Sequence, residues 1–143
     1  MDANTIELLK ECSSGCQMAM DSVKKMREYT KDEKLNELLE AYGEKHRQLE
    51  GEINEQLRNC GEEEKAPAKM AEIMANMEMS LKMMVHPDDH EVAKIMMDGC
   101  NMGIQSVSEY VNKYPDASGE SQNVAKKLIG IEEDFMQEMK GYV

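Results

Sequence analysis

The segment GCQMAMDSV at residues 15–23 recurs as GCNMGIQSV at residues 99–107. Five of the nine positions are identical, and each copy lies in a long stretch whose apolar residues recur at alternating steps of three and four. This spacing is the heptad pattern of packed helices. The repeat therefore predicts two similar helix–helix halves related by a pseudo-twofold axis.

The apolar face of each repeated helix extends beyond these nine residues. In the first helix it comprises Leu9, Cys12, Cys16, Ala19, Val23 and Met26. In the second it comprises Ala93, Met96, Cys100, Gly103, Val107 and Tyr110, each 84 residues after its counterpart. Because the register is shared along the whole face, we expect equivalent residues to lie at equivalent depths in one core.

Five helical segments are expected in a single domain that spans residues 1–143. Their approximate bounds are 4–29, 31–60, 67–85, 88–113 and 117–142. A very short turn between the first two forces them to run antiparallel, and segment 67–85 is a Met-rich crossover to the second pair. The predicted fold is an all-α, antiparallel four-helix bundle with a short helix in the crossover.

Capping residues mark the expected helix starts. They are Asn4 with Glu7, Thr30 with Glu33, Asp88 with Glu91, and Ser118. A side-chain oxygen at the position before a helix accepts a hydrogen bond from a free N–H of the first turn, and a Glu three residues later can reciprocate. These four positions therefore predict where four of the helices begin.

Composition and charge restrict both the core and the partners. With 4% aromatic residues, no Trp and 15 Met, the core must consist of Leu, Ile, Val, Ala and Met, which suits interdigitating helices. The net charge of −12 argues against a nucleic-acid surface and against adsorption to anionic lipid. No apolar run approaches the ~20 residues of a membrane span, and Asp2 and Glu7 interrupt any N-terminal signal. We therefore expect a cytoplasmic protein.

Three stretches carry a family resemblance. They are LLKECSSGCQMAM (8–20), GEKHRQLEGEINEQL (43–57) and KIMMDGCNMGIQSVSEYVNKYP (94–115). On these stretches the chain resembles the ferritin-like superfamily and, more narrowly, a bacterial family of ferritin-like bundles of unknown function. The resemblance implies two helix pairs joined by a long connection.

The catalytic members of that superfamily hold two irons, using one Glu on each of the first and third bundle helices and Glu-x-x-His on each of the other two. This chain departs from that pattern. The residues three before His46, His86 and His90 are Gly43, Met83 and Pro87, so no Glu-x-x-His occurs. Glu132 and Glu133 flank Ile131 on the last helix, and we expect both to face water. A di-iron centre needs several inward carboxylates, so di-iron chemistry is the least favoured interpretation.

The remaining candidate metal ligands are Cys12, Cys16, Cys100 and His46. Thiolate and thioether ligands favour a soft ion such as Cu(I), and Zn or Fe would also accept this set. The alternative is that the cysteines, together with Cys60, are reduced thiols packed as small apolar residues. On that interpretation His46 is a buried structural residue, with Tyr42 or Tyr110 as its hydrogen-bond partner.

Because the predicted interior lacks the carboxylate set, the leading hypothesis is a non-enzymatic bundle with a structural or protein-interaction role. It would act as a homo-oligomer or with another protein, without nucleic acid, membrane or cofactor. The alternative is a metal-binding protein, through the Cys and His set or, less favoured, through a di-iron site.

Overall fold

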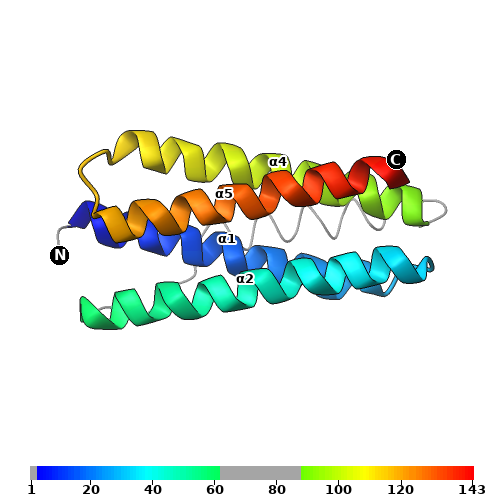
Figure 1. Ribbon diagram of the computed structural model, residues 1–143, viewed down its shortest axis with the longest axis horizontal. Coiled ribbons are helices and arrows are strands. Elements are labelled where there is room, and N and C mark those ends of the chain that lie inside the picture. The colour runs from blue at the N-terminus through cyan, green and yellow to red at the C-terminus, as the bar shows by residue number, and fades with distance from the viewer. Residues whose placement is uncertain (1–2, 62–87) are drawn as a thin grey trace.

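A computed structural model describes residues 3–61 and 88–143 of the chain, and helices make up most of both ranges (Figure 1). The helices are α1 (Ala3–Arg27), α2 (Glu33–Asn59), α4 (Asp89–Lys113) and α5 (Gly119–Met139), followed by the short 3-10 helix η1 (Lys140–Tyr142). Neither described range contains a strand, and the prediction of an all-α protein is confirmed. The helix expected over residues 67–85 lies outside the described residues.

The four long helices lie side by side along one axis (Figure 1). α1 packs antiparallel to α2, and α4 packs antiparallel to α5, so each short connection closes a hairpin. The two hairpins meet through α1 with α4, α1 with α5, and α2 with α5. None of the described helices is long and apolar enough to cross a membrane.

Two of the predicted capping residues occupy their expected positions. Asp88 precedes α4, and its side chain accepts a hydrogen bond from the Glu91 N–H at 3.0 Å. Ser118 precedes α5 and accepts a hydrogen bond from the Ser121 N–H at 3.2 Å. Asn4, in contrast, lies inside the first turn of α1, where its side chain donates to Asp116.

The capping box expected from Thr30 to Glu33 is wrong. Asp32 is the residue before α2, and its carboxylate accepts from the Leu35 N–H at 2.8 Å. The Thr30 hydroxyl instead donates to the Met26 carbonyl in the last turn of α1, at 2.8 Å. The physical reason is that a helix end leaves carbonyls free, and Thr30 satisfies one of those rather than an N–H of the next helix.

The repeated helices bury equivalent residues, as their shared register predicts. Four of the predicted pairs are buried on both helices: Leu9 with Ala93, Cys12 with Met96, Cys16 with Cys100, and Val23 with Val107. At the other two, Ala19 and Met26 are buried, whereas Gly103 and Tyr110 are half-buried. The core is therefore shared by both halves, with α4 somewhat more open than α1.

Candidate functional site

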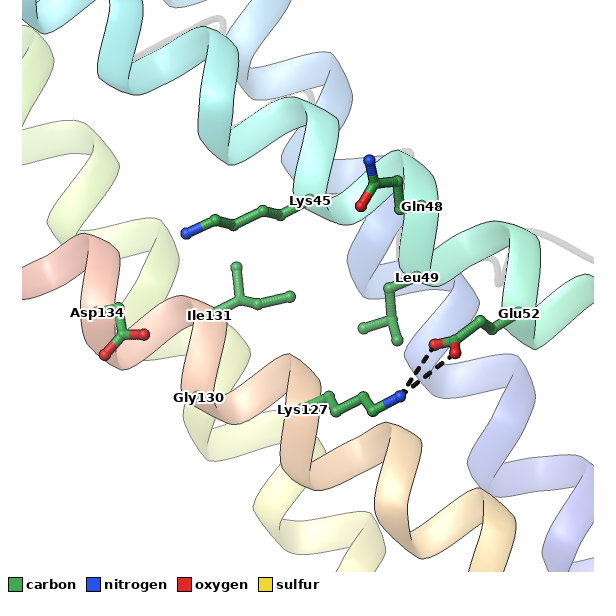
Figure 2. Close-up of a pocket in the computed structure, with 8 residues that line it drawn as sticks. All are labelled: Lys45, Gln48, Leu49, Glu52, Lys127, Gly130, Ile131 and Asp134. Carbon is green, nitrogen blue, oxygen red and sulfur yellow. Dashed lines mark hydrogen bonds and ion pairs between the residues drawn. The ribbon is translucent and has the colours of Figure 1, made fainter.

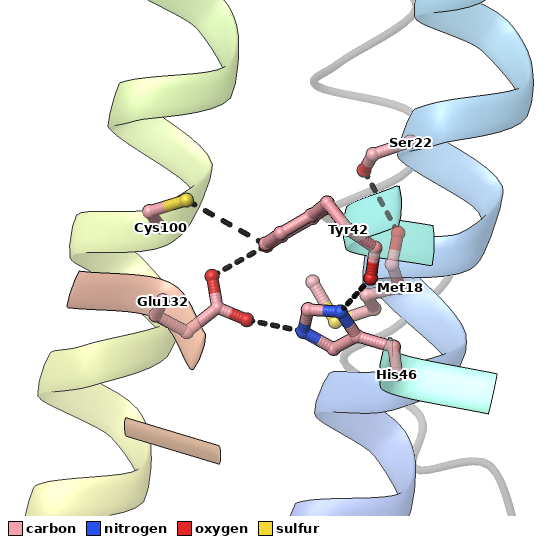
Figure 3. Close-up of polar contacts among 6 residues, drawn as sticks. All are labelled: Met18, Ser22, Tyr42, His46, Cys100 and Glu132. Carbon is pink, nitrogen blue, oxygen red and sulfur yellow. Dashed lines mark hydrogen bonds and ion pairs between the residues drawn. The ribbon is translucent and has the colours of Figure 1, made fainter. Parts of the chain in front are cut away.

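A group of buried polar side chains lies at the middle of the bundle (Figure 3). It consists of Tyr42 and His46 from α2, Cys100 from α4 and Glu132 from α5, and we refer to these four residues as the polar cluster. Each is 5% exposed or less. Since α2 belongs to one hairpin and α4 and α5 to the other, the cluster joins the two halves of the fold.

Hydrogen bonds connect the cluster into a continuous chain (Figure 3). The His46 Nε2 lies 2.5 Å from Oε1 of Glu132, and the Tyr42 hydroxyl donates to Oε2 of the same carboxyl group at 2.5 Å. The Nδ1 of His46 lies 2.7 Å from the Tyr42 carbonyl, one turn earlier on α2. The Cys100 thiol completes the chain 3.6 Å from the Tyr42 hydroxyl.

The geometry determines how many protons the His46–Glu132 pair holds. A carbonyl only accepts, so the His46 Nδ1 must carry a proton and donate it to the Tyr42 carbonyl. The contact between Nε2 and Oε1 then requires one further proton, either on the imidazole or on the carboxyl group. In both arrangements the pair has no net charge, which keeps its burial from leaving an isolated charge in the core.

Burial keeps the other two members of the cluster protonated. It raises the pKa of the Tyr42 hydroxyl well above its ordinary value, and the neighbouring Glu132 raises it further. Burial is also the main cause that raises the pKa of the Cys100 thiol, again with a contribution from Glu132. Tyr42 and Cys100 therefore serve as hydrogen-bond donors and not as anions.

Aromatic packing closes the cluster on one side. The ring of Phe135 stacks on Tyr42 with centroids 3.9 Å apart and planes inclined by 25°. The Tyr42 ring in turn meets the edge of the His46 imidazole, with centroids 4.2 Å apart. These contacts fix the orientation of both polar rings and exclude water from the hydrogen bonds between them.

Glu132 is the residue that the sequence analysis missed, and the expectation that it faces water is wrong. It is 4% exposed, whereas its neighbour Glu133 is exposed as predicted. The buried face of α5 runs from Leu128 through Glu132 to Phe135, so it passes beside Ile131. The spacing of the sequence could have indicated this, because the steps of four and three through Glu132 fit a heptad as well as the steps of three and four through Ile131 do.

The predicted metal ligands fall into two groups. His46 and Cys100 belong to the polar cluster, where both contact Tyr42. Cys12 and Cys16 lie in a separate hydrophobic cluster with Leu49 and Ile53. Burial raises the pKa of the Cys12 thiol to about 12, which leaves it protonated at neutral pH. Within residues 3–61 and 88–143, no three His, Cys, Asp or Glu side chains are grouped so that they could hold a metal ion.

The residues at the centre do not fit a di-iron site of the kind that the ferritin-like resemblance implies. The cluster offers one carboxylate and one imidazole, whereas two irons need several carboxylates to balance their charge. Both carboxylate oxygens and both imidazole nitrogens already have partners within the chain.

A surface hollow of about 560 Å³ lies between α2 and α5, open to solvent (Figure 2). Its lining residues are Lys45, Gln48, Leu49, Glu52, Lys127, Gly130, Ile131 and Asp134. Lys127 forms an ion pair with Glu52 at 3.3 Å. None of the four residues of the polar cluster lines this hollow, so the hollow gives them no opening to solvent.

Comparison with known proteins identifies one family. The model of a family described as a domain of unknown function, DUF2383, matches residues 4–114, which is most of the chain and includes α1, α2 and α4. Neither the curated proteins nor the solved structures contain a match.

Proposed function

We propose that this chain, which belongs to the DUF2383 family, is a non-enzymatic bundle of ferritin-like topology with a structural or protein-interaction role. The observation that carries this proposal is the closure of the polar cluster. Every polar side-chain atom of Tyr42, His46 and Glu132 has a hydrogen-bond partner inside the chain. A catalytic acid or base must come within hydrogen-bond reach of its substrate, and these groups are buried away from solvent.

The helix arrangement supports the ferritin-like part of the proposal. α1 and α2 form one antiparallel pair and α4 and α5 form another, and among the described helices the longest separation in sequence lies between the end of α2 and the start of α4. This is the connectivity of bundles that have one long crossover. His46 and Glu132 lie 86 residues apart on the second helix of each pair, at matching positions of the two buried faces.

The polar cluster supports a structural role because its contacts cross between the two hairpins. The hydrogen bond that the Tyr42 hydroxyl donates to Glu132 and the contact between His46 and Glu132 join α5 to α2, and the Cys100 thiol joins α4 to α2. A slip of either hairpin by one turn would leave a buried carboxyl group or imidazole without a partner, which is costly. The cluster therefore favours one register of the two halves over the alternatives.

The second candidate is a metal-binding protein that uses Cys12, Cys16, Cys100 and His46, with Cu(I), Zn or Fe. The observation that favours it is that two of these four residues, His46 and Cys100, both contact Tyr42. A metal ion there would have to displace the proton between His46 and Glu132. The thiols of Cys12 and Cys100 are free. Free thiols support the cytoplasm, a reducing compartment, as the proposed location.

Elemental analysis separates the two candidates. The chain is purified anaerobically, its Fe, Zn and Cu content is measured, and it is then titrated with Cu(I). We expect less than about a tenth of an equivalent of each metal and no tight Cu(I) uptake. The double variant Cys16→Ala/Cys100→Ala is compared with Cys60→Ala, which removes a half-buried thiol outside the candidate set. Stoichiometric metal lost in the double variant but kept in Cys60→Ala would reverse the ranking.

A further inference from the structure

The hollow between α2 and α5 has oppositely charged residues at alternating corners. α2 contributes Lys45 at one end and Glu52 at the other, and α5 contributes Lys127 and Asp134. Since α2 and α5 run antiparallel, Asp134 lies across from Lys45, and Lys127 lies across from Glu52 (Figure 2). The sign of the charge therefore changes along each helix and also across the hollow.

This arrangement complements itself. If a second copy of the same face is turned over about an axis along the hollow, its Lys45 comes to lie over Asp134 and its Lys127 over Glu52. Turning it about an axis across the hollow places Lys45 over Glu52 and Lys127 over Asp134. In either orientation each positive corner meets a negative one, which is the condition for an isologous contact between identical chains.

We infer that the face lined by Lys45, Glu52, Lys127 and Asp134 docks a second copy of this chain; the inference rests on the interaction role proposed above and names its partner. We call this surface the docking face.

The charge of the docking face supports a second copy over a foreign partner. The whole chain carries a net charge of −12, so two copies repel each other over most of their surfaces. The four charged corners, two positive and two negative, sum to zero. Two copies can therefore approach through this face with little of the repulsion that other approaches meet.

Two of the corner residues are available for contacts with a partner. Lys45 and Asp134 are exposed and lie on opposite sides of the hollow. The structure gives neither of them an ion pair within residues 3–61 and 88–143. Lys127 and Glu52 are already paired with each other, and their side chains are 58% and 50% exposed. A second copy would extend that pair into a square of four alternating charges.

Gly130 supports a close approach at the same place. It lies in the interior of α5 and lines the hollow, although glycine destabilises a helix interior relative to alanine. Within the described part of the chain, no atom lies within 4 Å of the position that a Cβ would take, so no internal packing requires a glycine here. Without a side chain at position 130, another molecule can reach the backbone of α5 and the apolar floor formed by Leu49 and Ile131.

Sedimentation equilibrium of charge-reversed variants tests the inference. The wild-type chain is expected to self-associate as its concentration rises, at a fixed ionic strength of about 0.15 M that screens the repulsion between the two acidic chains. Lys45→Glu/Lys127→Glu makes all four corners negative, and Glu52→Lys/Asp134→Lys makes all four positive. Each double variant alone is expected to self-associate at least about tenfold more weakly, because four attractive pairs become repulsive. An equimolar mixture of the two is expected to form heterodimers.

Two further variants separate docking from folding. Lys24→Glu/Arg47→Glu makes the same change in net charge at exposed positions outside the docking face, and we expect it to dimerise almost as the wild type does. Gly130→Gln adds a side chain to open space, so it is expected to keep the circular dichroism of the native helices and to lose self-association.

Several results would overturn the inference. They are a wild-type chain that is still monomeric at about 1 mM, double variants that dimerise as tightly as the wild type, or a mixture of the two that stays monomeric. Self-association and metal content are measured independently. A failure of the docking face is therefore distinguishable from a failure of the structural role, which the metal analysis tests.

Discussion

Removing either partner of the buried His46–Glu132 pair is predicted to cost a large part of the stability of the fold. The two side chains are 0% and 6% exposed, so whichever one remains cannot recover its hydrogen bonds from water. Truncation of one member of a buried pair costs about 3–5 kcal/mol, out of a total of roughly 5–15 kcal/mol for a domain. We therefore expect His46→Ala and Glu132→Ala each to lose about 3–5 kcal/mol.

Glu132→Gln is predicted to be much milder. The Tyr42 carbonyl holds a proton on the Nδ1 of His46, so the Nε2 of a neutral imidazole is free to accept. A glutamine amide can donate to that Nε2, and its oxygen can accept from the Tyr42 hydroxyl, which preserves each cluster contact that the carboxyl group makes. We expect this variant to lose about 1 kcal/mol, the net value of an ordinary hydrogen bond.

Urea unfolding followed by circular dichroism measures both effects, since the chain has no Trp to report by fluorescence. A matched control lies on the same two helices: the exposed ion pair between Glu52 and Lys127. A double-mutant cycle with alanine should give a coupling energy of roughly 0.2–1 kcal/mol for the exposed pair and a clearly larger one for His46 with Glu132. A Glu132→Ala variant that loses less than about 1 kcal/mol, or equal coupling in the two cycles, would refute the reasoning.

Three other predictions follow from burial and backbone geometry. The half-buried thiol of Cys60 should react with a thiol reagent in the native protein, whereas Cys12, Cys16 and Cys100 should react only as the chain unfolds; rapid modification of all four would contradict their burial. Burial raises the pKa of Cys12 from 9.0 to about 12, so its stabilising contribution is complete below about pH 9 and is lost as the pH rises towards 12. The unfolding free energy should therefore fall by roughly 1 kcal/mol more in the wild type than in Cys12→Ala between about pH 8 and pH 10, and equal losses would exclude this linkage. A Cβ at position 43 would meet Cγ1 of Val23 at 3.3 Å, whereas nothing in the described chain lies within 4 Å of a Cβ at position 51. We therefore expect Gly43→Ala to be destabilising and Gly51→Ala to be stabilising by about 0.5–1 kcal/mol. Thermal melts of the two variants measure this difference, and the reverse order of stability would contradict the packing.

The local signals in the sequence predicted most of the helical framework. Heptad spacing placed Cys12, Cys16 and Cys100 in the core, and short-range capping preferences placed Asp88 and Ser118 before their helices. Such signals depend on residues within a turn or two of each other, so one sequence is sufficient to detect them.

The polar cluster was harder to predict because its contacts join residues far apart in the chain. His46 was expected on the buried face of its helix, but its side-chain partner Glu132 is 86 residues away. Glu132 has a carboxyl side chain, and such side chains usually face water. Glu132 becomes a plausible core residue only once a second helix presents an imidazole to it. The four candidate metal ligands share the same limitation, since helix periodicity places each one in the core but does not say which of them meet.

The most direct test of a closed, structural polar cluster is the stability of the chain when refolded without metal. The protein is unfolded in urea in the presence of a chelator and is then refolded without metal. Its unfolding free energy is measured with and without added Zn(II), Fe(II) or Cu(I). The structural role predicts the same unfolding free energy in every case, because His46 and Glu132 are already satisfied by each other and by Tyr42. A metal that adds about 2.7 kcal/mol at a hundredfold excess over its dissociation constant, and fails to do so in Glu132→Gln, would contradict it.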